Sequence, residues 1–459
     1  MQKFDVIVLG AGQAGIPLAK KFAKAGKKVA IIEKREIGGT CINDGCSPTK
    51  TMVASARVAY LTKNGAKWGA LSDNFRIDYQ TVLNRKNEIV ESFRNGATKG
   101  LEKEKNITIF MGLGYFETAN QIKIDLKTGT IDVYGDLIFI NTGCSPRIPN
   151  IDGLDKTPYL TSTTIMELQE VPEHLIIIGG GYIALEFGQM MGRFGAKVNI
   201  LEKSDTLLPH EDDDVCIAIT DIFKSENIEI HTSSEVLSVS GDNKSKIVKA
   251  KINGKEHQFT GSHILVATGR EPQTKQLKLS FAGVKTDDRG YIEVNDNLQT
   301  STKNIYALGD VKGGPAFTHI AYNDYLVVTD NLLKEKNHTT KNRIVPYCMF
   351  TDPQLGRVGI TEDEAKKKKL NYKVAKLEMK YVARALETGE TKGYMKAVVD
   401  ADTKQILGAS IIGEQGGEIM SVLQMAMLGK ITYEQIRNNI FAHPLFSESL
   451  NNLFMSLDE

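Results

Sequence analysis

The chain has few of the features that mark secreted, membrane-spanning or nucleic-acid-binding proteins. Its 459 residues contain five cysteines, too few for the disulfide framework of a small secreted protein. It has no run of about eighteen uninterrupted apolar residues, so we expect no membrane span. The formal net charge of +1 gives no electrostatic reason to expect nucleic acid or an anionic membrane as partner. A strand-like pattern from Phe4 leaves no room for a signal peptide, so we expect a cytoplasmic protein.

The remaining composition is that of a large globular enzyme. Apolar residues make up 41% of the chain and charged residues 25%. At roughly 150 residues per domain, the length predicts about three domains. The lysine run at 366–369 follows the acidic residues 362–364 and is typical of a solvated helix face.

One segment of the chain occurs twice. Each copy has an apolar stretch typical of a buried parallel strand, a glycine turn, a helical stretch and a second strand that ends in glutamate. Corresponding positions are 169 residues apart, namely Gly10 and Gly179, Gly12 and Gly181, Gly15 and Ala184, Glu33 and Glu202. One such motif is weak evidence, but two copies with the same internal spacing predict two dinucleotide sites. The alternative is a pair of structural glycine turns that bind nothing.

The residue types in this repeat suit a dinucleotide. The first glycine allows a tight turn, the second lets the backbone approach a pyrophosphate, and the third position lets the helix pack against the strand. The start of the helix supplies unpaired N–H groups and a positive dipole for the phosphates. Glu33 and Glu202 would accept hydrogen bonds from ribose hydroxyls.

A second repeat predicts where the domains begin and end. Residues 138–146 are similar to residues 264–272, and each segment reads as a strand that ends in Thr-Gly. We therefore predict a nucleotide-binding domain at 146–269, inserted in a first domain formed by residues 1–145 and 270–340.

The end of the first domain and the C-terminal region have their own patterns. A strand would lead into Gly309 and Asp310, where Asp310 is either a plain turn residue or a carboxylate for a ligand. Residues 341–459 read as a separate α+β module. Its predicted elements are antiparallel strands at 392–400 and 406–413 and a helix at 418–428.

Cys41 and Cys46 form the only close cysteine pair in the sequence. A loop this short closes a disulfide if the backbone turns, which Gly45 permits. Pro48 suits the first turn of a helix, which would place Cys46 at its positive end and stabilise a thiolate. Lys50 would lie on the same side of that helix. The alternatives are an inert buried pair or a metal site, but no second cysteine pair is present, so we expect no metal.

Other candidates rest on weaker local evidence. Glu186, on the opening turn of a predicted helix, is either an acid favoured by the dipole or the partner of Lys50. His443 precedes Glu448 by five residues, which fits a base oriented by an acid, although a surface histidine before a helix-starting proline fits too. The scattered cysteines are interpreted as packing residues: Cys144, Cys216 and Cys348.

Together these motifs resemble the flavin-dependent pyridine nucleotide–disulfide oxidoreductases, which include dihydrolipoamide dehydrogenase, glutathione reductase and mercuric reductase. The resemblance covers essentially all of residues 1–459. The motifs that carry it are Gly10 to Glu33, Gly38 to Lys50 with both cysteines, Thr142-Gly143, Gly179 to Glu202, Thr268 to Arg270, Gly309-Asp310, and His443 to Glu448. It implies an α/β fold with two Rossmann-like, three-layer nucleotide-binding domains, the second inserted in the first, and a C-terminal α+β dimerisation domain.

The resemblance also implies cofactors and roles. FAD would be bound by the first glycine motif with Glu33, and by Gly39, Thr40, Lys50, Thr142, Gly143, Gly309 and Asp310. The nicotinamide nucleotide would be bound by Gly179, Gly181, Ala184, Glu202 and Gly269. Cys46 would face the flavin and Cys41 would exchange with substrate. Lys50 with Glu186 would sit beside the reactive nitrogen of the flavin. His443, oriented by Glu448, would act as acid and base across a homodimer interface.

The implied reaction passes electrons between nicotinamide, flavin, the Cys41–Cys46 disulfide and a substrate disulfide or dithiol. Glu202 is followed by Lys203 and by no arginine in the next several residues, which favours NAD over NADP because a carboxylate repels a 2′-phosphate. No cysteine follows Cys348, so the C-terminal pair of mercuric reductase is lacking, and Leu445 replaces the usual threonine after His-Pro.

The substrate hypotheses are dihydrolipoamide or another small thiol, metal or quinone-like acceptor. Two further functions fit part of the sequence. A redox sensor that turns over slowly would also use the disulfide, but it has little need for His443 and Glu448. A flavin oxidase or peroxidase would use a single redox cysteine, which the Cys41 and Cys46 pair argues against.

Overall fold

The computed structural model describes residues 1–458, which divide into two compact units. Unit 1 consists of Met1–Met52, Gln80–Arg147 and Gly269–Arg343. Unit 2 consists of Val53–Tyr79, Ile148–Thr268 and the chain from Ile344 onward. In this part of the chain, no helix combines the length and the apolar character needed to cross a membrane.

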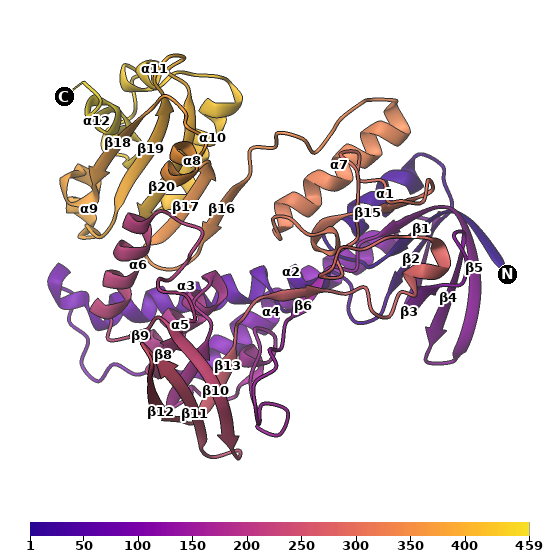
Figure 1. The fold of residues 1–459 in the computed structure, drawn as a ribbon, viewed down its shortest axis with the longest axis horizontal. Helices are drawn as coiled ribbons and strands as arrows, with labels where there is room; N and C mark the ends of the chain where they lie inside the picture. The colour runs from indigo at the N-terminus through magenta and orange to yellow at the C-terminus, as the bar shows by residue number, and fades with distance from the viewer. Residues whose placement is uncertain (459) are drawn as a thin grey trace. The chain divides into compact units, whose positions relative to one another are not determined.

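Unit 1 is built on a parallel sheet. Its hydrogen-bonded strands run β3-β2-β1-β5-β15, and β4 pairs antiparallel with both β3 and β5. Two helices, α1 and α7, lie side by side over this sheet (Figure 1). The bounds are β1 (Gln2–Leu9), α1 (Gly15–Lys24), β2 (Val29–Glu33), β3 (Ile107–Phe116), β4 (Gln121–Leu126), β5 (Gly129–Ile140), β15 (Ile305–Ala307) and α7 (Thr318–Lys334).

The strand sequences explain these three layers. β1 is apolar on both faces because both faces of a parallel sheet are buried. Val6 and Val8 belong to the core under α1 and α7. Ile7 and Leu9 belong to the opposite core, which includes residues of the β3-β4-β5 meander. The period-2 alternation of β1 therefore joins helices, parallel sheet and antiparallel meander into one domain.

Further elements of unit 1 lie outside this sheet. A short antiparallel ribbon is formed by β6 and β14, which lie where the chain leaves unit 1 and where it returns to unit 1. Helix α3 begins in unit 1 and continues into unit 2. The bounds are α2 (Gly39–Asn43), α3 (Cys46–Lys63), α4 (Tyr79–Glu102), β6 (Cys144–Pro146) and β14 (Arg270–Pro272).

The nucleotide-binding part of unit 2 repeats the same layers. The parallel sheet β13-β7-β8-β9 carries helix α5, and Ile176 and Ile178 of β7 share a hydrophobic core with Val248 of the antiparallel sheet β10-β11-β12. The bounds are β7 (His174–Ile178), α5 (Tyr182–Phe194), β8 (Lys197–Leu201), α6 (Asp213–Ser225), β9 (Glu229–His231), β10 (Ser234–Gly241), β11 (Lys246–Ile252), β12 (Lys255–Gly261) and β13 (His263–Val266). The repeat inferred from the sequence is thus a repeat of architecture.

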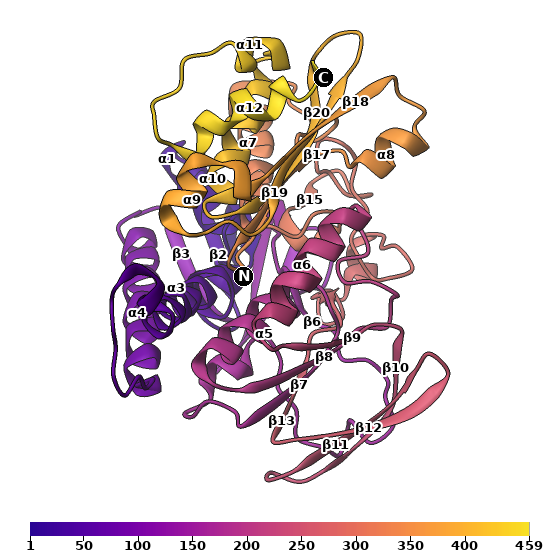
Figure 2. The ribbon, with the colours of Figure 1, turned by 90° about the vertical axis from the view of Figure 1, so that its left-hand side faces the viewer.

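The C-terminal part of unit 2 is an antiparallel sheet, β16-β17-β20-β19-β18, covered by α10 and α12 (Figure 2). The predicted antiparallel strands are confirmed as β19 and β20, and the predicted helix is α10. The lysine run at 366–369 is exposed at the end of α8, as predicted. The bounds are β16 (Pro346–Met349), β17 (Gln354–Gly359), α8 (Glu362–Lys367), β18 (Tyr372–Glu378), α9 (Ala383–Thr388), β19 (Tyr394–Asp400), β20 (Ile406–Gly413), α10 (Gly416–Leu428), α11 (Tyr433–Arg437) and α12 (Leu450–Met455).

Candidate active site

The two glutamates of the repeat make the same pair of hydrogen bonds. In unit 1, Glu33 accepts from the backbone N–H of Ala11 at 2.9 Å and of Arg35 at 2.8 Å. In unit 2, Glu202 accepts from the backbone N–H of Gly180 and, at 2.7 Å, of Ser204. Each glutamate is therefore fixed at the end of its strand, against the glycine turn. This position suits recognition of a ribose, as the sequence predicts.

The first glycines of the two motifs hold equivalent turns. Gly10 has φ +102° and Gly179 φ +109°, a region that glycine adopts without strain. A Cβ on Gly10 would lie 2.4 Å from Asn141 O, and one on Gly179 would lie 2.5 Å from Ala267 O. Gly12 and Gly181 follow in each turn, and Gly15 and Ala184 lie in the first turn of α1 and α5. The turns therefore leave backbone N–H groups at two helix starts, which fits dinucleotide phosphates.

The other residues predicted to bind FAD lie at the carboxyl ends of neighbouring strands in unit 1. Thr142 and Gly143 follow β5, and Gly309 and Asp310 follow β15, which pairs with β5. Gly39 and Thr40 begin α2, where a Cβ on Gly39 would lie 2.8 Å from the Cα of Gly12. Burial raises the pKa of Asp310, against the opposing charges of Arg270 and Lys312. This edge of a parallel sheet is where open α/β folds bind nucleotides, so the residues present fit FAD.

Cys41 is the third residue of α2 and Cys46 is the first residue of α3; no disulfide joins them in the structure. Cys46 is the first residue of the 18-residue helix α3, as the sequence predicts. A hydrogen bond to Cys46, followed by burial, raises the pKa of the Cys41 thiol. Cys41 therefore keeps its proton at neutral pH and needs a base before it reacts as a nucleophile.

Thr318 is a site residue that the sequence analysis missed. Its hydroxyl lies 3.5 Å from Cys46 Sγ, and it also hydrogen-bonds the Cys41 side chain, which lowers the pKa of that thiol. Thr318 is the first residue of α7 and lies 272 residues from Cys46 in the chain. No local pattern in the sequence could indicate this contact.

Lys50 and Glu186 are in different units. Lys50 is half-buried on α3, one turn after Cys46. Glu186 is buried on α5 and accepts a 2.8 Å hydrogen bond from the backbone N–H of Phe350. The sequence pattern predicts Glu186 on the opening turn of its helix. Because α5 begins at Tyr182, Glu186 instead lies just past that turn. The pairing of Lys50 with Glu186 stays a prediction.

His443 and Glu448 form a hydrogen-bonded dyad. Glu448 lies 2.9 Å and 3.1 Å from His443 Nδ1 through its two carboxylate oxygens. The His443 side chain is 69% exposed, so its other ring nitrogen is accessible for proton exchange. The geometry is that of a base oriented by an acid.

The other three cysteines are wholly or partly buried. Cys144 and Cys216 are buried, and Cys348 is half-buried. Burial raises the pKa of Cys144 to about 12. Among residues 1–458, no three His, Cys, Asp or Glu side chains group as metal ligands.

Two family profiles match the chain. The profile for "Pyridine nucleotide-disulphide oxidoreductase" matches residues 4–324, and the profile for the dimerisation domain of the same proteins matches residues 345–454. The chain belongs to the pyridine nucleotide-disulphide oxidoreductases. The family, the fold and the enzyme class predicted from the sequence are thereby confirmed.

Known members are similar over nearly the whole chain. "Probable pyridine nucleotide-disulfide oxidoreductase RclA" from Escherichia coli K12 is 37% identical, with 99% of both chains covered. Its Cu(II) complex has been solved and superposes with a TM-score of 0.91 over 99% of each chain, at 37% identity. A mercuric reductase from Lysinibacillus sphaericus is 32% identical over 99% of this chain and 83% of that protein. A dihydrolipoyl dehydrogenase from Chlamydia muridarum is 32% identical over 97% of this chain and 95% of that one.

Membership determines the general chemistry. The protein is a flavin-dependent disulfide oxidoreductase that uses FAD and a pyridine nucleotide. Its C-terminal part is a dimerisation domain, and the protein forms a homodimer.

Proposed function

We propose that this flavoenzyme transfers electrons from NADH to a small acceptor through the Cys41 and Cys46 pair. The observation that carries the proposal is the surroundings of the pair. Cys46 begins a long helix whose dipole favours a thiolate, while Cys41 holds a proton in hydrogen-bonding contact with it. Cys46 is thus prepared to exchange electrons with the flavin, and Cys41 to exchange with a substrate.

FAD would be held by the glycine turn and Glu33, by Gly39, Thr40, Thr142 and Gly143, and by Asp310. When bound, the flavin supplies the hydride and electron chemistry that amino-acid side chains lack. Lys50, paired with Glu186, would place a positive charge next to the flavin. The protein's own contribution is to orient the nucleotides and to set which cysteine carries the proton.

His443 supplies the base that Cys41 requires. The thiol of Cys41 has a raised pKa, so exchange with a substrate needs proton removal. The Glu448 carboxylate on Nδ1 orients the ring and leaves Nε2 for the proton transfer. In this family of homodimers, we propose that the dyad of one protomer serves the cysteines of its partner.

NADH is the proposed nucleotide in preference to NADPH. Glu202 is held at the end of β8 by Gly180 and Ser204, where a ribose hydroxyl would donate to it and a 2′-phosphate would be repelled. Comparing kcat/KM for the two nucleotides tests this directly. We expect NADH to be preferred by at least about tenfold, and a preference for NADPH would contradict the assignment.

The proposed acceptor is a small disulfide such as lipoamide, and Cu(II) is the second candidate. Cu(II) is included as a candidate because the similar RclA from E. coli has been solved as a Cu(II) complex. Two Cu(II) ions would take one electron each from the two thiols, giving two Cu(I), one disulfide and two protons. Anaerobic turnover of NADH with lipoamide or with Cu(II) separates the candidates. If NADH reduces the cysteines but neither lipoamide nor Cu(II) is turned over, the acceptor is another small molecule.

A further inference from the structure

Asp352 is held through every polar group it has. It lies in the turn between β16 and β17. Its backbone N–H donates to Gln189 Oε1 at 2.7 Å, and its backbone O accepts from Gln189 Nε2 at 2.7 Å. Its carboxylate accepts from Arg57 at 2.5 Å and from Arg193. These contacts together fix the position of Asp352 in the fold.

The two arginines come from different helices. Arg57 is on α3 and also pairs with Glu414 at 3.0 Å. Arg193 is on α5 and also pairs with Glu226 at 2.8 Å. The Arg193 guanidinium lies 4.1 Å from the ring centroid of Tyr60, one turn after Arg57 on α3. Asp352 is therefore the shared anion at a junction between α3 and α5.

The junction is well shielded from solvent. The side chain of Arg193 is 6% exposed and that of Asp352 is 12% exposed. Burial would raise the pKa of the Asp352 carboxyl, but Arg193 and Arg57 lower it. A charged pair in such surroundings contributes strongly to a unique geometry when all its partners are present.

Each helix also carries one residue of the proposed pair beside the flavin, at the same distance from the junction. On α3, Lys50 precedes Arg57 by seven residues; on α5, Glu186 precedes Arg193 by seven residues. Seven residues are about two turns, or roughly 10 Å along a helix axis, and return to the same face. A link between the two arginines is therefore also a constraint on Lys50 and Glu186.

We propose that Asp352 is a positioning residue for the nicotinamide half-reaction, because it locks α5 to α3 and so sets Glu186 against Lys50. The inference rests on the proposed pairing of these two residues. Phe350, two residues before Asp352, donates its backbone N–H to Glu186, so the same turn also orients that carboxylate directly. Asp352 touches neither substrate nor cofactor in this scheme.

The test compares two half-reactions of the FAD-loaded, full-length protein by anaerobic stopped-flow. We expect Asp352→Asn to slow flavin reduction by NADH about tenfold, because small misplacements are costly in hydride transfer. Reduction by dithiothreitol, which enters through the cysteines, should change by less than about twofold. Asp352→Asn keeps the shape of the side chain, and the arginines keep Glu226 and Glu414, so the variant should fold.

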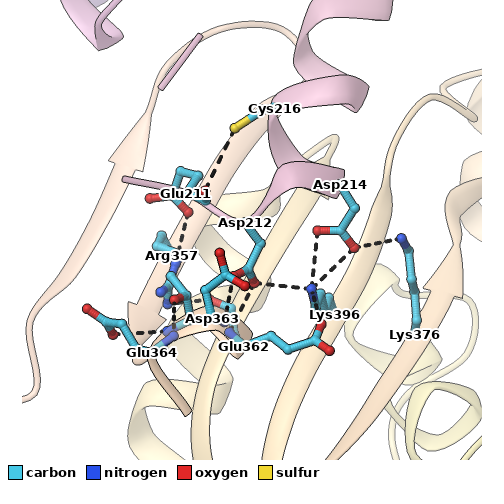
Figure 3. Close-up of polar contacts among 12 residues, drawn as sticks. Glu211, Asp212, Asp214, Cys216, Arg357, Glu362, Asp363, Glu364, Lys376 and Lys396 are labelled. Atoms are coloured by element: carbon cyan, nitrogen blue, oxygen red, sulfur yellow. Dashed lines mark hydrogen bonds and ion pairs between the residues drawn. The ribbon is translucent and has the colours of Figure 1, made fainter. Parts of the chain in front are cut away.

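Arg57→Gln should reproduce the selective loss, and the double variant should be no slower than the slower single variant if the two residues act as one link. The matched control is Glu211→Gln. Glu211 is a similarly buried acid of unit 2 that pairs with Arg357 at 3.0 Å and with Tyr347, and it contacts neither α3 nor α5 in these interactions (Figure 3). It should leave both half-reactions within about twofold of wild type.

Hydrogen–deuterium exchange gives a readout that does not depend on activity. In Asp352→Asn, peptides from α3 and α5 should exchange several-fold faster, and in Glu211→Gln they should not. An Asp352→Asn protein with wild-type exchange and wild-type reduction by NADH would overturn the inference, as would equal loss in both half-reactions. If the wild-type protein is not reduced by NADH, the proposed function fails. The hydrogen–deuterium exchange measurement still tests whether Asp352 holds α3 and α5 together.

Discussion

At the scale of single residues, Cys41 and Cys46 have different surroundings although only four residues separate them. Cys46 begins α3 and is exposed, whereas Cys41 is half-buried in α2 and holds a proton through its contact with Cys46. The Thr318 hydroxyl contacts both thiols from another helix. The sequence predicts the pair, the helix and a thiolate at Cys46. It does not predict the burial of Cys41 or the contact of Thr318, because both depend on tertiary packing.

Cys41→Ser should abolish turnover of disulfide acceptors, because the exchanging sulfur is lost. Flavin reduction by NADH should persist within about twofold, since that step does not need Cys41. Steady-state assays and stopped-flow on the same preparation measure both. Cys348→Ser is the matched control, because Cys348 lies on β16 and has no part in the proposed electron path, so its loss should leave turnover intact. Normal disulfide turnover in Cys41→Ser would refute the assigned electron path.

His443→Gln should slow thiol exchange by about 10²- to 10⁴-fold, the usual contribution of a general base. The loss should be largest at neutral pH and should shrink as the pH rises, because hydroxide then removes the proton from Cys41, whose thiol pKa is raised. The pH dependence of disulfide reduction, with lipoamide as acceptor, measures this. His257→Gln, an exposed histidine on β12, should behave as wild type. Equal loss in flavin reduction and thiol exchange would contradict the role of His443.

At the scale of elements, the sequence repeat predicted both glycine turns, and the structure shows what each glycine requires. Gly179 has a positive φ and no room for a Cβ, whereas a Cβ on Gly181 would have no atom within 4 Å. Both positions are glycine in the motif, yet only the first is needed for the fold. The open space at Gly181 fits the close approach of a pyrophosphate.

Gly181→Ala should therefore keep the thermal stability of wild type while raising the KM for NADH by about tenfold or more, because the new methyl occupies the pyrophosphate position. Gly179→Ala should instead lower Tm by several degrees through backbone strain. Thermal unfolding and NADH titration of the two variants make the comparison. A Gly181→Ala protein with unchanged KM would show that no nucleotide passes over this turn.

The motifs give no indication of the ion pairs that join α6 to the C-terminal sheet. Buried Lys396 on β19 contacts Asp212 at 3.1 Å, Asp214 at 3.2 Å and Glu362 at 2.6 Å (Figure 3). Burial would lower the pKa of Lys396, but Glu362 and the two aspartates raise it. Sequence patterns do not reveal such pairs, because their members lie up to 184 residues apart.

Lys396→Met should destabilise the protein by about 3 kcal/mol at pH 7, since it leaves the buried Asp212 carboxylate without its cation. Burial would raise the pKa of Asp212, yet the backbone N–H groups of Asp363 and Glu362 together with Lys396 lower it. A carboxyl with a lowered folded pKa stabilises above its unfolded pKa of about 4, and this contribution is lost as the pH falls. The difference between wild type and variant in urea unfolding should therefore shrink from pH 7 to pH 3. A constant difference would contradict the assigned ion pair.

At the scale of the whole molecule, the fold class followed from sequence because the chain repeats one nucleotide-binding architecture and then changes pattern. The strands that precede each Thr-Gly, the second sheet and the C-terminal module are all present as predicted. What the sequence could not supply are contacts between distant segments: Thr318 at the cysteines, Phe350 at Glu186, and Asp352 between two helices. Each depends on tertiary packing rather than on local periodicity.

The most direct test of the account is an anaerobic titration of the purified flavoprotein, first with NADH and then with dihydrolipoamide, while the flavin spectrum is recorded. We expect two-electron reduction with a long-wavelength absorption band, which reports the Cys46 thiolate next to the oxidised flavin. The same band with dihydrolipoamide would favour lipoamide as the disulfide acceptor. Bleaching of the flavin without the band would show that the cysteines are not coupled to it, and an oxidase or a redox sensor would then replace the proposed function.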